Sequence, residues 1–326
     1  MKCINKALLL SFIISSAVLF AGCGKKEYSM EFDRNMNSTS YTMVGIADVN
    51  STLTGYTETI CVDFGEYPKG IEYLDSEAGG LFDMNDLDVI YGKNLYSSMN
   101  PASLTKIMTA YVALKYGNLG DRITVTENAM ITESGAQTAG LRPGDTMTLE
   151  QALNIMMVCS ANDAAAAIAE HVGGGSMEVF VNAMNAEALR IGATGTHFTN
   201  PHGLTDENHK TTPYDLYLIF NEALKDETFK NIIGQVAYAT TISDAAGNAK
   251  EINVNSTNSF LKGDYEAPLD VAVLGGKTGT TAAAGSCLTI YAKDSANHYY
   301  ITVILNAPDR ETSYTDTIAL LQLHGN

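Results

Sequence analysis

The hydrophobic pattern of this chain changes once along its length, from helical spacing to short strand-like runs. From residue 104 onward, apolar residues recur at i, i+3, i+4 and i+7, which places them on one face of a helix. The predicted helices begin near residue 101 and continue with 148–158, 163–172, 176–191 and 212–224. Strand-like runs follow at 236–242, 252–255, 271–274, 286–292 and 299–305, before a closing helix at 312–323. Helices followed by hairpin-connected strands predict an α+β fold with an antiparallel sheet.

Local signals mark the ends of several elements. Asn100 followed by Pro101 is typical of an N-cap and the first position of a helix. Residues 148–151 have the sequence of a capping box. Two apolar runs around the turn-forming residues 85–88 predict a hairpin over residues 80–92, and residues 59–64 are a candidate edge strand.

The charge balance narrows the range of partners. The 326 residues include 20 Lys and Arg against 37 Asp and Glu, and 45% of them are hydrophobic. This is the composition of a folded protein with an acidic surface. Nucleic acid is therefore not an expected partner.

The first 22 residues have the features of a signal peptide. An apolar run from Ala7 to Phe20 follows two lysines, and small residues lead directly into Cys23. This resembles a bacterial lipobox, in which Cys23 is acylated, although Phe20 stands where leucine is usual. We expect a lipoprotein signal peptide at 1–22, a tether and N-terminal extension at 23–70 and a folded domain at 71–326. The lipid would anchor the chain to the outer face of the cell membrane; ordinary cleavage with release is the alternative.

Three of the five cysteines lie in the predicted domain or just before it, at wide and irregular spacing: Cys61, Cys159 and Cys287. This pattern indicates neither a disulfide framework nor a metal cluster. We interpret them as mostly buried free thiols, with a Cys159–Cys287 bridge as a conceivable alternative.

The first motif with candidate chemistry is Ser103 with Lys106. Residues three apart on a helix are neighbours, so a neutral lysine amine there would be a base for the serine hydroxyl. The positive end of the helix dipole would favour an alkoxide and lower the pKa of the lysine. The same spacing at Ser259 and Lys262 is attributed to chance, which shows how weak this motif is alone.

Two further motifs follow. Ser160 and Asn162 lie between predicted helices, where a hydroxyl would relay a proton and an amide would orient the substrate; they also fit a helix cap. Lys277-Thr278-Gly279 occurs once and ends an apolar run, so it is expected on a strand. A lysine and a hydroxyl there would bind a carboxylate, and Gly279 would allow the backbone of another segment to approach closely. The alternative interpretation is an ordinary lysine at the end of a strand, before a turn.

The order of the three motifs is far more specific than any one of them. Ser160 follows Ser103 by 57 residues, and Lys277 follows Asn162 by 115. Together with the text at 101–110, 160–165, 200–204 and 275–288, this resembles the low-molecular-mass penicillin-binding proteins, serine D-alanyl-D-alanine carboxypeptidases of the peptidase S11 family, over residues 77–323. The resemblance implies the serine β-lactamase/D,D-peptidase-like fold, an antiparallel sheet flanked by helices plus a mostly helical subdomain.

The resemblance also implies a mechanism without metal or cofactor. Ser103 would attack the carbonyl between two D-alanines of a peptidoglycan stem peptide, Lys106 would take its proton, and β-lactams would inhibit by acylating Ser103. Ser160 would pass a proton to the leaving D-alanine and Asn162 would hold the substrate amide. The residues implied to bind substrate are Lys277, Thr278, Gly279 and Thr280, with the backbone N–H groups of Ser103 and Thr280 as the oxyanion hole.

Some features depart from the family pattern, and two rival functions stay open. Thr280 stands where relatives often carry an aromatic residue or histidine, and residues 133–141, expected near the site, lack the usual Gly-Ser-Ser-like sequence.

A class A-type β-lactamase would need a glutamate after Ser160. The only sequence that matches the pattern around that glutamate, 150–154, precedes Ser160 and lies inside a predicted helix. A penicillin-binding sensor that acylates without turnover is the other rival. His202 and His209 near Asp206 are interpreted as turn residues and not as zinc ligands.

Overall fold

The computed structural model describes residues 60–65, 67 and 74–325. The predicted signal peptide, Cys23 and residues 24–59 of the predicted tether lie outside this part. Within it, no helix combines the length and the apolar character needed to cross a bilayer.

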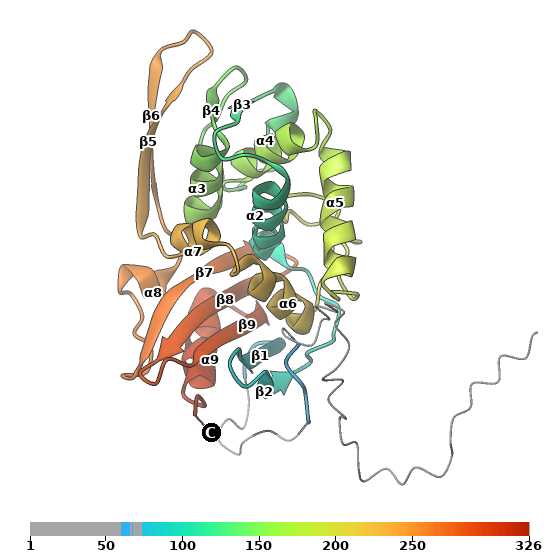
Figure 1. Cartoon of the computed structure of the whole chain (residues 1–326), viewed down its shortest axis with the longest axis vertical. Helices are drawn as coiled ribbons and strands as arrows, with labels where there is room; N and C mark the ends of the chain where they lie inside the picture. The colour runs from blue at the N-terminus through green and yellow to red at the C-terminus, as the bar shows by residue number, and fades with distance from the viewer. Residues whose placement is uncertain (1–59, 66, 68–73, 326) are drawn as a thin grey trace, which may run out of the picture. The chain divides into compact units, whose positions relative to one another are not determined.

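An antiparallel sheet of five strands forms one half of the described fold, in the order β2-β1-β9-β8-β7 (Figure 1). Its strands are β1 (Ala78–Asp83), β2 (Asp88–Lys93), β7 (Val271–Thr281), β8 (Gly285–Asp294) and β9 (Tyr299–Ala307). Side chains alternate along β9: Ile301 and Val303 pack into the core shared with the helices, whereas Tyr300 and Ile304 pack against the closing helix α9 (Arg310–Leu321). The sheet is therefore buried on both faces.

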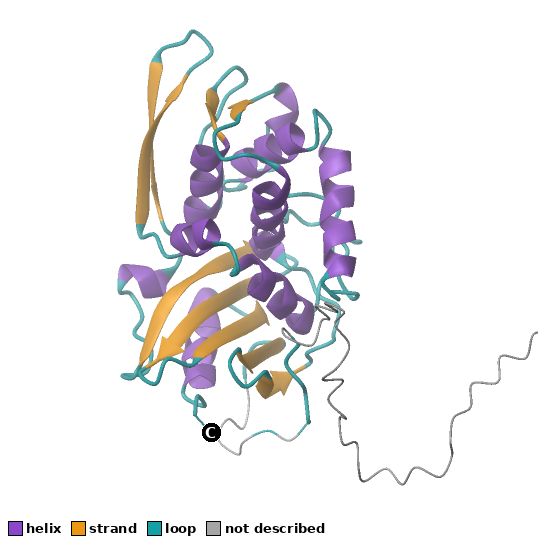
Figure 2. Cartoon of the chain, in the orientation of Figure 1, coloured by secondary structure: helices purple, strands orange, loops and turns teal. Residues whose placement is uncertain are grey.

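The other half is mostly helical, as Figure 2 shows by colour. Its helices are α2 (Thr105–Tyr116), α3 (Leu149–Cys159), α4 (Asn162–Val172), α5 (Met177–Arg190), α6 (Pro213–Ala223) and α7 (Glu227–Ile233). Helix α2 is central, because the side chains of Leu104, Ile107 and Met108 at its start are fully buried and it contacts α3, α4, α5 and α6. The predicted α+β fold and the predicted helices are confirmed, including the capping box of Thr148 and Gln151.

Two local predictions were wrong. Asn100 does not cap α2: a 3₁₀ turn (Ala102–Leu104) precedes that helix, and the Asn100 side chain instead donates to the carbonyl of Ala283, 3.2 Å away. The described part of the candidate edge strand contributes only one isolated parallel bridge, between Val62 and Asp88. Asn100 and Val62 both contact segments that are distant in the sequence, and local sequence patterns do not reveal such contacts.

Several short elements were not predicted. They are η3 (Glu127–Ala129), α7, α8 (Ser259–Lys262), β3 (Arg122–Thr124) and β4 (Thr146–Thr148), all too brief to show a period. Strands β3 and β4 join β5 (Ala237–Ser243) and β6 (Ala249–Asn255) in a second sheet, whose β5–β6 hairpin extends beyond the helices in Figure 1. Strand β7 also runs further than the predicted 271–274, because pairing with β8 continues past a bulge at Leu274, between Val273 and Gly275.

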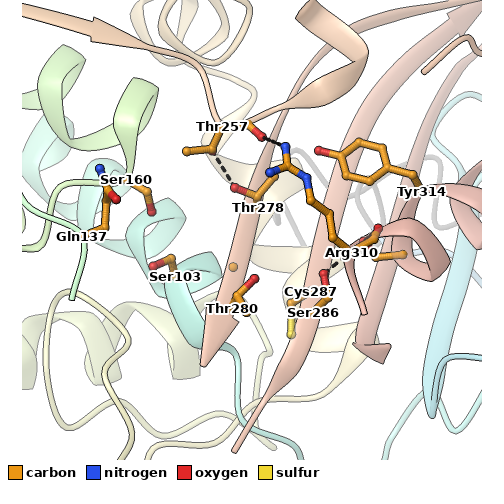
Figure 3. Close-up of a pocket in the computed structure, with 12 residues that line it drawn as sticks. Ser103, Gln137, Ser160, Thr257, Thr278, Thr280, Ser286, Cys287, Arg310 and Tyr314 are labelled. Atoms are coloured by element: carbon orange, nitrogen blue, oxygen red, sulfur yellow. Dashed lines mark hydrogen bonds between the residues drawn. The ribbon is translucent and has the colours of Figure 1, made fainter. Parts of the chain in front are cut away.

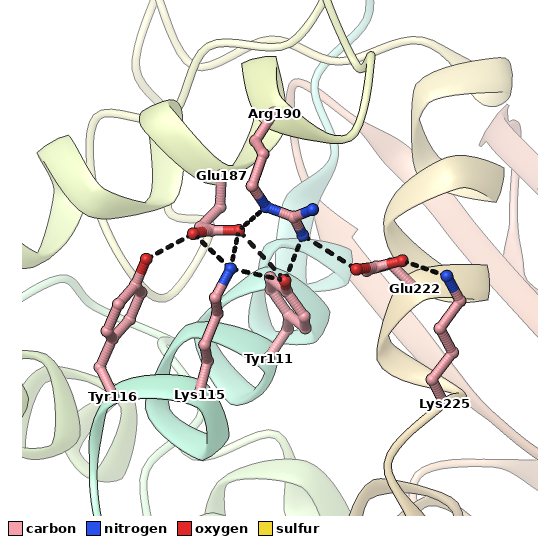
Figure 4. A network of polar contacts seen from close by, with 7 residues as sticks. All are labelled: Tyr111, Lys115, Tyr116, Glu187, Arg190, Glu222 and Lys225. Carbon is pink, nitrogen blue, oxygen red and sulfur yellow. Dashed lines mark hydrogen bonds and ion pairs between the residues drawn. The ribbon is translucent and has the colours of Figure 1, made fainter. Parts of the chain in front are cut away.

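A charged network ties three of the helices together on the side away from the sheet's closing helix. Glu187 of α5, with a side chain only 5% exposed, accepts hydrogen bonds from Lys115, Tyr111 and Tyr116 of α2 and from Arg190 of its own helix (Figure 4). Arg190 also pairs with Glu222 of α6, which pairs with Lys225. Because every group has a partner, the network holds the far end of α2 in place.

Candidate active site

The site begins where the chain turns sharply into α2. Ala102 has a φ of 47°, a left-handed conformation that is uncommon for a residue with a side chain. The 3₁₀ turn that begins at Ala102 contains Ser103, and Lys106 lies in the first turn of α2. The Lys106 side chain is fully buried although it carries an amine. The structure thus brings the first motif together as predicted, with Ser103 half-buried at its edge.

Three oxygen atoms surround the amine of Lys106. Its Nζ lies 2.9 Å from Ser103 Oγ, 2.6 Å from Asn162 Oδ1 and 2.6 Å from the carbonyl oxygen of His202. The amide and carbonyl oxygens can only accept, so they take two N–H groups. In the neutral amine the remaining lone pair then faces the serine hydroxyl, the arrangement that a base requires.

The second motif occupies the junction of α3 and α4. Ser160 ends α3 in the left-handed conformation, with a φ of 65°, and Asn162 is the first residue of α4. Both side chains are buried, and the backbone N–H of Asn162 donates to the carbonyl of Gln137 at 2.8 Å. The segment 133–141 therefore lies beside the site, as the sequence predicted, and the buried carboxylate of Asp163 holds it through the N–H groups of Ala139 and Leu141.

The third motif lies on β7, the edge strand of the five-stranded sheet. Lys277 Nζ donates to Ser160 Oγ and to the carbonyl of Thr278, each at 2.8 Å. Gly279 packs against the 3₁₀ turn before α2 so closely that a Cβ added there would lie 2.9 Å from the Ser103 nitrogen. The predicted close approach of another backbone is thus confirmed, and the three motifs converge.

Burial dominates the electrostatics of the two lysines. Desolvation, reinforced by the positive charge of Lys277, holds the pKa of Lys106 well below the ordinary 10.5. Desolvation also lowers the pKa of Lys277 to about 7. Burial thus favours the uncharged form of Lys106, the form in which its lone pair would face Ser103 Oγ.

A cavity of about 210 Å³ opens between the motifs (Figure 3). Sequence reasoning missed four of its lining residues, Thr257, Arg310, Ser313 and Tyr314, and included Gln137 only as part of the segment 133–141. The guanidinium of Arg310 donates to the carbonyl of Thr257 at 2.9 Å, and the hydroxyl of Thr257 lies 2.6 Å from that of Thr278. Arg310 thus adds a cation near Thr278, on the side of the cavity formed by the sheet and α9. No motif marks Thr257 or the three residues of α9, because both segments lie outside the three sequence motifs.

The segment 200–204 contacts the amine of Lys106 through the backbone carbonyl of His202. Asn200 Oδ1 accepts from the N–H of Gly203 at 2.7 Å, which closes the turn that presents the His202 carbonyl to Lys106. The ring of His202 accepts from the N–H of Leu204, and the ring of His209 contacts Thr105 and Thr199. Both rings are therefore hydrogen-bonded within the protein, and His209, expected in a polar turn, is buried.

The three thiols among the described residues are free and buried. The conceivable bridge between Cys159 and Cys287 is not formed. Cys287 lines the cavity on β8, opposite Gly279, and burial raises its pKa to about 12. It is therefore a protonated, weakly reactive thiol at neutral pH.

The site combines a serine hydroxyl beside a buried amine with a second hydroxyl held by a second lysine, next to a cavity lined by an edge strand. These are the parts of a serine acyl-transfer site. Comparison with known proteins identifies the family. Residues 70–309 match the profile of Peptidase_S11, D-alanyl-D-alanine carboxypeptidase. The chain belongs to this family.

Individual proteins of this family are also similar to the chain in sequence or in structure. The chain is 32% identical over 237 residues to D-alanyl-D-alanine carboxypeptidase DacF of Bacillus subtilis, covering 72% of this chain and 58% of that protein. It is 30% identical over 257 residues to D-alanyl-D-alanine carboxypeptidase DacC of Escherichia coli, covering 76% and 60%. The chain thus spans about three fifths of the length of these curated relatives. Among solved structures, the Streptomyces K15 DD-transpeptidase superposes with a TM-score of 0.71 at 26% identity, over 77% of this chain and 97% of that one.

Proposed function

We propose that the protein is a serine D-alanyl-D-alanine carboxypeptidase that removes the terminal D-alanine from peptidoglycan stem peptides. The observation that carries this proposal is the environment of Lys106, a buried amine with two obligatory acceptors and one remaining contact, to Ser103 Oγ. Burial lowers the pKa of this amine and so favours the neutral form, which would be a base for Ser103. Membership in the family supports the assignment.

In the proposed reaction, Ser103 Oγ forms a bond to the carbonyl carbon between the two D-alanines, and its proton passes to Lys106. The negative charge that develops on the carbonyl oxygen would be met by the backbone N–H groups of Ser103 and Thr280. The C–N bond then breaks, and the amine of the leaving D-alanine takes a proton through Ser160, whose hydroxyl receives a hydrogen bond from Lys277. Water next attacks the ester on Ser103 and releases the shortened peptide.

Substrate recognition would use the sheet edge. A stem peptide in extended form would lie along the edge strand β7, where Thr278, Gly279 and Thr280 line the cavity. Its terminal carboxylate would bind between Lys277, the Thr278 hydroxyl and Arg310, because a guanidinium with a neighbouring hydroxyl matches a carboxylate well. Asn162 would hold the amide of the preceding residue.

β-Lactams are proposed inhibitors, since they present a reactive amide and a carboxylate at the same spacing as the substrate. A β-lactamase is less favoured: the text 150–154 that resembles a deacylating glutamate lies inside α3, before Ser160. For location, we propose an extracytoplasmic protein that is anchored through a lipid on Cys23, as the lipobox-like text indicates.

Intact-mass measurement after brief exposure of the full-length chain to benzylpenicillin tests the function. We expect one adduct that maps to Ser103, persists for an hour and is absent from Ser103→Ala, and we expect D-alanine release from a D-Ala-D-Ala peptide. Loss of the adduct within seconds, with consumption of the drug, would make the protein a β-lactamase. A lasting adduct without D-alanine release would make it a sensor, and no adduct would refute the assignment.

A further inference from the structure

The direction of the Ser103 N–H is set by the residue before it. This N–H belongs to the same planar peptide unit as the Ala102 carbonyl, and in a trans unit the two groups point in opposite directions. Ala102 holds the uncommon φ of 47°, so contacts from elsewhere must maintain this peptide. Whatever fixes the Ala102 oxygen therefore aims the Ser103 N–H.

Two neighbours fix that oxygen. Thr105 donates to it from its backbone N–H and from its hydroxyl, the latter at 2.8 Å. Gly203 packs directly on the same group, because a Cβ added to Gly203 would lie 1.9 Å from the Ala102 oxygen. On the opposite side of the peptide, Gly279 faces the Ser103 nitrogen. The peptide is thus clamped between the 200–204 segment and β7.

His209 determines which way the Thr105 hydroxyl points. Its Nδ1 accepts from the backbone N–H of Thr199 at 3.0 Å, so the ring proton is on Nε2, which lies 2.7 Å from Thr105 Oγ1. The histidine therefore donates to Thr105, and the threonine hydroxyl is left to donate to Ala102. His209 is 2% exposed and Thr105 is fully buried, and burial lowers the pKa of His209 to about 4, which keeps a single neutral form at pH 7.

We propose that His209 is a positioning residue for the oxyanion hole, acting through Thr105 on the Ala102–Ser103 peptide. This inference rests on the proposed acyl-enzyme function. An N–H that is aimed correctly stabilises charge that exists only in the transition state. Loss of the relay should therefore slow acylation and leave initial binding of the ligand unchanged.

Two pairs of variants separate this role from simple packing. His209→Gln places an amide N–H near the position of Nε2 and keeps the donor to Thr105. His209→Asn places an amide oxygen near the position of Nδ1, so it keeps the acceptor for Thr199 and loses that donor. Thr105→Ser keeps the hydroxyl, whereas Thr105→Val replaces it by a methyl group of similar size. His197→Asn, at an exposed histidine in the bridge that pairs with Lys210, is the matched control.

The experiment measures acylation of the full-length chain by benzylpenicillin over a range of concentrations, which separates the acylation rate constant from the dissociation constant, together with the melting temperature. We expect His209→Asn and Thr105→Val to lower the rate constant about 10- to 100-fold with the dissociation constant within about twofold. His209→Gln, Thr105→Ser and His197→Asn should stay within about threefold of the wild type.

The inference is overturned if folded His209→Asn and Thr105→Val are acylated at the wild-type rate, or if His209→Gln lowers the acylation rate constant as much as His209→Asn does. It is also overturned if the variants change the dissociation constant and not the rate constant. Should His209→Asn not fold, Thr105→Val alone decides. A wild-type protein that is not acylated at all would instead refute the proposed function.

Discussion

The amine of Lys277 lies 2.8 Å from the hydroxyl oxygen of Ser160, although 117 positions separate the two residues in the chain. This contact joins the edge of the sheet to the junction of α3 and α4, the two sides of the cavity. The amine is also fully buried, which lowers its pKa to about 7. Because Lys277 is buried, its protonation should make the free energy of unfolding depend on pH.

The first prediction concerns the pH dependence of that stability. Below pH 7 both folded and unfolded chains bind a proton at Lys277; between about 7 and 10.5 only the unfolded chain does. The free energy of unfolding of the wild type should therefore rise with pH relative to Lys277→Met, by up to about 1.4 kcal/mol per pH unit. Urea unfolding of both proteins at several pH values from 7 to 10 measures this difference; a difference independent of pH would contradict the low pKa.

A second prediction concerns Gly203. It has a φ of +88°, and a Cβ there would meet the Ala102 oxygen at 1.9 Å. Gly203→Ala should therefore lower the free energy of unfolding by about 3 kcal/mol or more. Gly247, in the β5–β6 turn, has a φ of +86° but open space around it, so Gly247→Ala should cost only about 1–2 kcal/mol. Chemical denaturation gives the free energy of unfolding of each variant, so the difference between them isolates the cost of the steric clash at Gly203. Equal losses would show that the segment 200–204 can move away from Ala102 without cost.

The third prediction addresses the network of Figure 4. Burial opposes ionisation of Glu187, but hydrogen bonds from Lys115, Tyr116 and Arg190 outweigh it and lower the pKa to about 2. The resulting stability is complete above the ordinary pKa of 4.5 and is lost as pH falls towards 2. Glu187→Gln should cost about 1–3 kcal/mol at pH 7 and progressively less between pH 4.5 and 2. Thermal unfolding over this range is the measurement, and a cost that does not change with pH would show that the charge is unimportant.

The last prediction tests the carboxylate site. Arg310→Gln should raise KM for a peptide ending in D-Ala-D-Ala about tenfold or more, because a hydrogen-bonded charge pair is worth about 1.5–3 kcal/mol. A peptide with a C-terminal amide lacks the charge, so wild type and variant should process it equally. Arg122→Gln, at an arginine on β3 that bonds to Thr146, is the control and should leave KM unchanged. An equal loss with acid and amide substrates would remove Arg310 from carboxylate recognition.

Local signals predicted what depends on neighbours in the chain. The capping box at Thr148 and the buried face of Leu104, Ile107 and Met108 were confirmed, because cap bonds and helical periodicity involve residues three or four positions apart. Asn100 was wrongly interpreted as a cap, since its side chain bonds to Ala283, 183 positions away. Propensity cannot register a partner at that distance.

The sequence by itself determined the α+β fold and the three motifs, since order and spacing are properties of the chain. Only the tertiary structure decided that Lys106 is enclosed by Asn162 and the His202 carbonyl, that Arg310 shares the cavity, and that His209 acts on Thr105. These relationships depend on burial and on which remote atoms meet. Desolvation and hydrogen-bond geometry exist only once the helical half and the sheet have packed together.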